Sequence, residues 1–312
     1  MNAALQALPD VSPRPDGNPF DLTDDAAYRR WRAWKLQQRP ADAAAITVDV
    51  ADPRALTIAE RHAVLDRIRR TNMALYRSPV LDEDPSLPRR LGEQLGLRRL
   101  DANWLAEEDG ISRIEVSARS DGKGGFIPYT THGIRWHTDG YYHPEARRIH
   151  GMILHAVRPA ASGGVNRLLD HELVYIALRD ASPALVRALM RPDAMTIPAR
   201  EDDDGIARPA QGGPVFSVEH GALHMRYTAR TRSIAWSPDP AVRAAVAALE
   251  RVLATPSPWI HRLTLAPGMG ILCNNVLHDR SGFADDPLRP RLILRARYHE
   301  RVGAPMVAPG LA

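Results

Sequence analysis

The chain has 312 residues, of which 44% are hydrophobic, so it can bury one large core or two modest ones. Its formal charge is +4, but the cations are almost all arginines and are scattered among 37 acidic residues. A basic stripe with interleaved aromatic residues, typical of nucleic-acid binding, is missing from the sequence, so we expect no nucleic-acid partner.

Localisation signals are also missing. The first twenty residues are rich in Pro, Gly and Asn, so 1–20 is expected to be a flexible segment. They hold four prolines and lack the cationic and apolar regions of a signal peptide. No run approaches the roughly 18 apolar residues of a membrane span. The single cysteine, Cys273, excludes an internal disulfide and a cysteine-rich metal site. We expect a cytoplasmic protein without a membrane partner, and a homo-oligomeric state stays open.

The sequence predicts one domain over 21–312, whose first part, about 21–109, is mainly helical. Apolar residues recur there at helical spacing, with capping residues before them and Gly96 after the last helix. The expected elements are helices at 21–39, 57–72 and 87–95, and strands at 44–50 and 74–77.

After about residue 110 the pattern changes to short apolar or alternating runs separated by Gly, Pro and Asp, which favours a sandwich or barrel. The most economical architecture is an α+β chain with a mainly β core, a double-stranded β-helix (jelly roll) over about 110–300. A helical insert over about 172–254 interrupts this core. The expected strands are 111–116, 134–136, 150–157, 167–170, 215–218, 222–227, 261–265, 270–274 and 292–298, and the expected insert helices are 172–178, 184–190 and 240–254.

A His-x-Asp unit, His137-Thr138-Asp139, lies just before the middle of the chain. In an extended strand the side chains at i and i+2 leave the same face, so the imidazole and the carboxylate can reach one ion. The best third ligand is His278, because a jelly roll pairs distant strands. Two imidazoles and one carboxylate form the ligand set of non-haem Fe(II) oxygenases.

A strand with alternating arginines follows His278. Alternation places Arg291, Ile293, Arg295 and Arg297 on one face and apolar residues on the other. Buried guanidinium groups require partners, and a dicarboxylate cosubstrate would be a suitable one.

Together these segments resemble the taurine dioxygenase-like (TauD/TfdA) family. The resemblance covers roughly 70–300. It is carried by His137-x-Asp139, the segment Pro159-Ala-Ala-Ser-Gly-Gly-Val-Asn166, Asn275-x-x-His278-x-Arg280-x-x-Phe283, and Arg291. Members are Fe(II)- and 2-oxoglutarate-dependent dioxygenases with a jelly-roll core of the clavaminate synthase-like type. The resemblance implies an enzyme that uses O2 to oxidise a small molecule and releases succinate and CO2.

The resemblance also implies roles for individual residues. His137, Asp139 and His278 match the iron ligands, and the intact Asp139 favours hydroxylation or another oxidation over halogenation. Arg291 matches the arginine that binds the distal carboxylate of 2-oxoglutarate. Asn166 stands where family members carry a threonine that contacts the same cosubstrate; its amide can donate an equivalent hydrogen bond.

Substrate contacts are expected from Arg295, Arg226, Trp136, Tyr141 and Tyr142, which lie in or near these segments. The two arginines favour a small anionic substrate, such as a carboxylate, a sulfonate or an amino acid derivative. The alternative function is a cupin-type jelly-roll metalloprotein that does not use 2-oxoglutarate and has no need of Arg291.

A second histidine pair, His220 and His224, has the spacing of a helical zinc site. Gly221 and the β-like residues around it favour a hairpin instead.

Overall fold

The computed structural model describes residues 14–101, 109–117, 126–202 and 205–303, with no side-chain description for 202–207. Of the expected flexible segment 1–20, residues 1–13 therefore lie outside the described residues. Phe20, at the end of that segment, is 2% exposed, and its ring meets the Trp31 ring edge-on with the centroids 5.1 Å apart. The extent of a flexible N-terminal segment stays a prediction.

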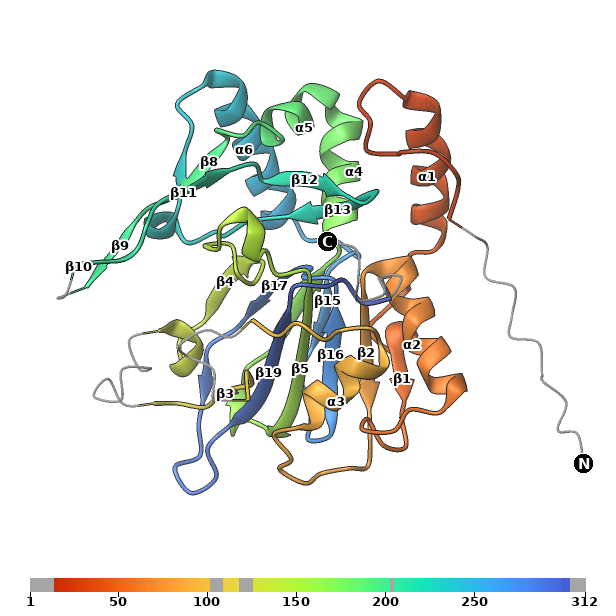
Figure 1. The fold of residues 1–312 in the computed structure, drawn as a ribbon, viewed down its shortest axis with the longest axis vertical. Coiled ribbons are helices and arrows are strands. Elements are labelled where there is room, and N and C mark those ends of the chain that lie inside the picture. Colours follow the sequence, from red (N-terminus) through yellow and green to blue (C-terminus); the bar gives the residue numbers. More distant parts are fainter. Residues whose placement is uncertain (1–13, 102–108, 118–125, 203–204, 304–312) are drawn as a thin grey trace, which may run out of the picture.

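Two facing sheets form the core, and the expected jelly roll is confirmed (Figure 1). The six-stranded sheet has the order β1 (Thr47–Asp49), β2 (Met73–Arg77), β16 (Met269–Cys273), β5 (Gly151–Arg158), β19 (Leu292–Tyr298) and β3 (Ser112–Ile114). The four-stranded sheet has the order β15 (His261–Leu263), β7 (Asn166–Leu169), β17 (Leu277–Arg280) and β4 (Ile134–His137). Apolar residues from both sheets, including Met152, Leu168 and Ile293, pack between them.

Helices α2 (Ile58–Thr71) and α3 (Leu87–Gln94) cover the outer face of the six-stranded sheet, in agreement with the expected helices (Figure 1). Thr57 and Glu60 form a capping box at the start of α2, in which each side chain accepts from the other residue's backbone N–H. The apolar side chains of β19 that point away from the cavity, Leu292, Leu294 and Ala296, pack with these helices. The predicted alternation along this strand is therefore confirmed.

A second apolar core lies beside the sheets, where α1 (Asp25–Gln37) packs with the insert helices α4 (His171–Ala181), α5 (Pro183–Leu189) and α6 (Pro240–Ala254). The α6 bounds agree with the expected helix at 240–254. In the insert the chain also forms a hairpin of β12 (Phe216–Glu219) and β13 (Ala222–Met225). His220 and Gly221 make its turn with φ of 50° and 74°, so the hairpin interpretation of the His220–His224 pair is confirmed.

Several elements differ from expectation. In the expected strand at 44–50, Ala44–Ile46 forms a 3-10 turn and only Thr47–Asp49 is a strand. The unpredicted strands are β6 (Ser162–Gly163), β8 (Met195–Ile197), β9 (Arg200–Asp202), β10 (Gly205–Arg208), β11 (Gln211–Gly213), β14 (Ala235–Trp236), β17 and β18 (Phe283–Ala284). All of these are two to four residues long. Such runs show too few periods of alternation to be recognised in a sequence. Within the described residues, no helix is long and apolar enough to cross a bilayer.

A buried ion-pair network joins α1 to α4. The Lys35 ammonium lies 2.6 Å from an Asp170 carboxylate oxygen and 2.5 Å from a Glu172 oxygen, and it donates to the Arg70 carbonyl at 2.8 Å. Burial by itself would lower the pKa of Lys35, but the two carboxylates raise it above its ordinary value. The charge of Lys35 therefore offsets two buried negative charges.

We predict that Lys35→Met lowers the free energy of unfolding by about 3–5 kcal/mol, because it leaves Asp170 buried without its cation and Glu172 with only the more distant Arg14, at 3.7 Å. Urea denaturation followed by circular dichroism measures the change. The control is Arg29→Ala, which removes an exposed pair with Asp25 and should have little effect. Equal stability of the two variants would contradict a supporting role for the network.

Candidate metal centre

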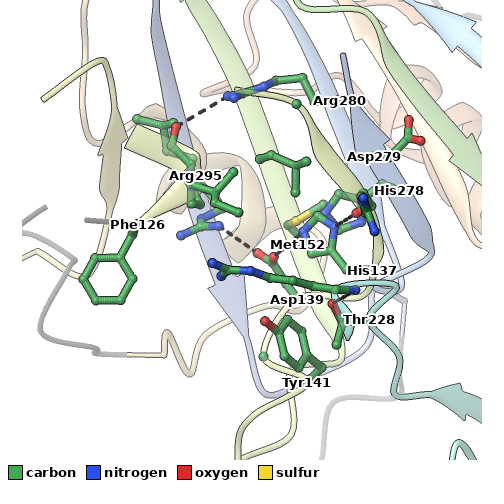
Figure 2. A pocket seen from close by; sticks show the side chains of 18 of the residues that line it. Phe126, His137, Asp139, Tyr141, Met152, Thr228, His278, Asp279, Arg280 and Arg295 are labelled. Atoms are coloured by element: carbon green, nitrogen blue, oxygen red, sulfur yellow. Dashed lines mark hydrogen bonds and ion pairs between the residues drawn. The ribbon is translucent and has the colours of Figure 1, made fainter. Parts of the chain in front are cut away.

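Pairing between β4 and β17 brings together the three residues expected to bind metal. The antiparallel register places His278 directly opposite His137, and the two ring centroids are 4.2 Å apart. Asp139 lies two residues past the end of β4, and one of its carboxylate oxygens is 3.6 Å from His137 Nε2 and 3.8 Å from His278 Nε2. Three ligand atoms therefore lie within 4.8 Å of one another (Figure 2).

Backbone carbonyls orient both imidazoles. His137 Nδ1 lies 2.9 Å from the carbonyl of Arg135, and His278 Nδ1 lies 2.9 Å from the carbonyl of Val276. A carbonyl oxygen only accepts, so in each ring Nδ1 carries the proton and Nε2 keeps a lone pair directed at the centre. Burial, with the neighbouring His137 as a further cause, lowers the pKa of His278 to about 4, so this ring is neutral at pH 7.

The Asp139 carboxylate stays ionised although it is buried. Burial would raise its pKa, but the charge of Arg295, whose Nη1 lies 3.2 Å from the outer carboxylate oxygen, holds the pKa well below its ordinary value. Two imidazole nitrogen donors and one carboxylate oxygen donor fit a divalent iron with positions left for other ligands.

Asn275 holds the backbone of Asp139, a role that could not be predicted from the sequence. Its side-chain oxygen accepts from the Asp139 N–H at 2.7 Å, and its amide nitrogen donates to the carbonyls of Asp139 and Ile149 at 2.9 and 2.6 Å. Its backbone is left-handed, with φ of 49°. Asp139 lies past the end of β4, where no strand pairing holds its backbone in the described structure. The hydrogen bonds from Asn275 hold the Asp139 backbone there instead.

The three residues face a cavity of about 450 Å³ between the sheets, within the usual size range of small-molecule sites. Met152, Leu154 and Ile293 give it an apolar wall from the six-stranded sheet. Arg291, Asn166, Arg295, Tyr141 and Tyr142, all expected from the sequence, line it as well.

Arg291 is 7% exposed, and its guanidinium lies 5.1 Å from the centre of the Phe283 ring. Among the described residues, no carboxylate lies within 4 Å of this guanidinium, but the Arg291 backbone N–H donates to Asp285 at 2.7 Å. Burial lowers the pKa of Arg291 to about 10 and the Asp285 charge opposes this shift, so the guanidinium is charged at pH 7. Asn166 donates to the Gly164 carbonyl at 3.3 Å. Gly163 supports this end of the cavity, because a Cβ there would lie 2.5 Å from the Gly282 carbonyl oxygen and its φ is 77°.

Two residues expected to touch substrate do not line the cavity. Arg226 donates to the carbonyls of Tyr141, Gln211 and Gly212 at 2.6, 2.7 and 3.1 Å. Its guanidinium therefore binds backbone groups and does not line the cavity. Trp136 points into the second core and lies under the Arg167 guanidinium at 4.8 Å. Strand alternation explains the direction of the Trp136 side chain, because Trp136 precedes His137 on β4 and therefore faces the opposite side of the sheet.

Other cavity residues were missed in the sequence. Arg135, Arg230 and Arg232 line the cavity, and Arg135 and Arg232 are exposed, so they lie toward its solvent side. Arg135 lies on β4 two residues before His137, so strand alternation could have placed it on the cavity face. Arg230 and Arg232 follow no periodic pattern, since Arg232 lies in a 3-10 turn (Thr231–Ser233) and Arg230 just before it.

Comparison with known proteins identifies the family. The model of the family described as taurine catabolism dioxygenase TauD, TfdA family, matches residues 35–297. The chain belongs to the TauD/TfdA family. A uridine-5'-phosphate dioxygenase from a Streptomyces species is 33% identical over 212 residues, which cover 65% of this chain and 75% of that protein.

Solved structures share the fold. The non-haem iron oxygenase OrfP, in complex with Fe and alpha-ketoglutaric acid, matches with a TM-score of 0.58 and 18% identity over 80% of each chain. An asparagine oxygenase, in complex with Fe(II), a hydroxyasparagine and succinate, matches with a TM-score of 0.56 and 15% identity over 93% of this chain and 92% of its own. AAD-2, in complex with Mn(II) and N-oxalylglycine, matches with a TM-score of 0.58 and 16% identity over 82% of this chain and 94% of its own.

Membership of the TauD/TfdA family makes this protein a 2-oxoglutarate-dependent non-haem iron dioxygenase, with Fe(II) as its metal and 2-oxoglutarate and O2 as cosubstrates. The alternative of a cupin-type metalloprotein without 2-oxoglutarate is not supported.

We predict that Asn275→Ala weakens Fe(II) binding about 10- to 100-fold, the usual effect of losing a residue that orients a metal ligand. Anaerobic Fe(II) titration in the presence of 2-oxoglutarate, followed by the visible charge-transfer band, measures the affinity. The neighbouring Asn274 bonds to Asn72 and Val302 rather than to Asp139, so Asn274→Ala should keep the affinity within about twofold. Unchanged affinity in Asn275→Ala would exclude this role.

Proposed function

We propose that His137, Asp139 and His278 hold the iron, that Arg291 and Asn166 bind 2-oxoglutarate, and that the substrate is a small phosphate ester of the nucleoside 5'-monophosphate type. The observation that carries the substrate class is the charge of the cavity wall. Seven arginines line the cavity against two carboxylates: Arg135, Arg230, Arg232, Arg280, Arg291, Arg295 and Arg297 against Asp139 and Asp279.

Both carboxylates already have cationic partners. Asp139 pairs with Arg295, and Asp279 forms a two-pronged ion pair with Arg167, which is not among the cavity-lining residues. Of the seven arginines, Arg295 and Arg297 have carboxylate partners, Asp139 and Asp101. The other five have no carboxylate within ion-pair distance among the described residues, so the cavity is short of negative charge. Two anions, a dicarboxylate cosubstrate and an anionic substrate, would supply the missing charge.

The Arg291 position supports its role toward 2-oxoglutarate. Its guanidinium is buried, charged and without a carboxylate partner among the described residues, and its planar donors match a carboxylate. Asn166 and the Gly163–Gly164 turn lie on the same side of the cavity, so the Asn166 amide is available to the same ligand.

The phosphate ester is favoured by the Streptomyces relative, which is named for uridine 5'-phosphate. Guanidinium groups bind phosphate with paired hydrogen bonds, and Arg295, Arg230 and Arg232 are available on the cavity wall. Phe126 and Tyr141 also line the cavity (Figure 2), as does Tyr142, and these rings offer aromatic surface to a base.

Bound Fe(II), with 2-oxoglutarate and O2, supplies the oxidation of a substrate C–H bond and yields succinate and CO2. The chain supplies orientation and exclusion of water. Arg295 contacts the outer oxygen of Asp139 and lines the cavity, so it can hold a substrate anion beside the metal ligands. A cytoplasmic location, the absence of a nucleic-acid partner and the oligomeric state stay predictions from the sequence.

We predict that uridine 5'-phosphate stimulates succinate formation with a KM at least about tenfold lower than that of uridine, because only the phosphate can pair with the arginines. Succinate formation at saturating 2-oxoglutarate is the measurement, and His137→Ala should abolish it. A screen in which only neutral or cationic compounds stimulate succinate would contradict the anionic class.

We predict that Arg291→Lys raises the KM for 2-oxoglutarate by about tenfold or more and changes the substrate KM by less than about twofold. Lysine keeps the charge but cannot form two parallel hydrogen bonds to a carboxylate. The control is Arg289→Lys, an exposed arginine two residues away. Unchanged 2-oxoglutarate kinetics in Arg291→Lys would mean that another residue anchors the cosubstrate.

A further inference from the structure

A buried carboxylate lies behind the cavity wall, outside all the sequence motifs. Asp101 is 1% exposed and accepts hydrogen bonds from Arg297 at 2.5 Å, from Arg147 at 2.9 Å and from His143 at 3.2 Å. Burial would raise its pKa, but the His143 hydrogen bond and the Arg297 charge hold the pKa well below its ordinary range. Asp101 thus remains an anion that ties β19 to the segment following Asp139.

Arg297 links Asp101 to the cavity, because it bonds to this carboxylate and also lines the cavity. It is buried, lines the cavity two residues beyond Arg295, and uses its second terminal nitrogen to donate to the Tyr142 hydroxyl at 2.9 Å. A guanidinium has no acceptor, so the tyrosine oxygen is the acceptor in this bond and its own proton stays free to donate. Among the described residues, no acceptor for that proton lies within hydrogen-bond distance.

The Tyr142 ring is also held in place. Tyr141 meets it edge-on at 5.3 Å, and the Arg208 guanidinium lies 5.8 Å from its centre and donates to the Tyr142 carbonyl at 3.4 Å. Ring contacts and the Arg297 hydrogen bond together limit the rotamers of Tyr142, which leaves a hydroxyl donor fixed on the cavity wall.

We propose that Tyr142 donates a hydrogen bond to the anionic group of the substrate, and that Asp101 is a positioning residue that acts through Arg297. This inference rests on the proposed anionic substrate. Asp101 orients the guanidinium, the guanidinium occupies a lone pair of the phenol oxygen, and the phenol proton is thereby turned toward the ligand. Polarisation by the cation strengthens that donor.

A purely structural role of Asp101 predicts different results from a positioning role. If Asp101 only held β19 to the neighbouring segment, its loss would lower stability and weaken iron, 2-oxoglutarate and substrate together. If it positions Tyr142, its loss weakens substrate alone, and it does so only while the Tyr142 hydroxyl is present.

The test is a double-mutant cycle of Asp101→Asn and Tyr142→Phe in the full-length iron-loaded enzyme. Each single variant should raise the KM for uridine 5'-phosphate about tenfold or more, and the double variant should be no worse than the weaker-binding single variant. The Kd of 2-oxoglutarate, from the anaerobic charge-transfer band, should stay within about twofold. Additive effects, or a matching loss of 2-oxoglutarate affinity, would overturn the proposal.

Arg147→Ala is the matched control, because Arg147 bonds to the same carboxylate but is half-exposed and does not line the cavity. The KM of Arg147→Ala for uridine 5'-phosphate should stay within about twofold of that of the unchanged enzyme. If Asp101→Asn does not fold, Arg297→Gln takes its place in the cycle.

Sulfate binding, detected by its effect on the charge-transfer band, tests this proposal independently of the substrate assignment. If sulfate binds the unchanged enzyme but not Tyr142→Phe, the Tyr142 hydroxyl is an anion donor even if no nucleotide is a substrate. Equal sulfate binding by the unchanged enzyme and Tyr142→Phe overturns the proposal.

Discussion

The pairing of β4 with β17 is the constraint on which the centre depends. Antiparallel register sets His137 opposite His278, and a slip of one residue would turn one imidazole to the other face of the sheet. Neighbouring strand β7 holds β17 from the other side, and β15 extends the same sheet. The carbonyls that orient the two rings belong to residues two positions earlier on each chain segment, so the local backbone also selects the tautomer.

The second constraint is the cost of placing arginines on a buried strand. β19 faces the helices with Leu292 and Leu294 and faces the cavity with arginines, so one strand serves both the apolar core and the site. Arg295 pairs with Asp139, and Arg297 pairs with Asp101. Arg291 has no such carboxylate among the described residues, and this imbalance points to a ligand rather than to a structural role.

Much of the fold could be predicted because its longer elements repeat their pattern several times. The α6 helix shows its apolar stripe over four turns and was predicted with the correct bounds. Short strands such as β8 and β14 exist because they pair with each other inside the insert, and three or two residues cannot show alternation. The alternation over 44–50 predicted a strand longer than the one that forms, because Ile46 is buried although it ends a 3-10 turn.

By itself, the sequence determined which chemistry the chain carries: His137, Asp139 and His278 are ligand types in a recognisable order, and the alternation around Arg295 places its side chain in the cavity. Tertiary structure alone decided the roles of Asn275, Asp101 and Arg226. Each bonds to groups brought from distant segments, two of them to backbone carbonyls that every residue possesses. The contacts of Asp101 and Arg226 leave no spacing or residue pattern in the chain, because their partners are determined by the packing of the sheets and not by the neighbouring sequence. Asn275 belongs to the Asn275-x-x-His278 motif, but the motif does not show which backbone groups its side chain bonds.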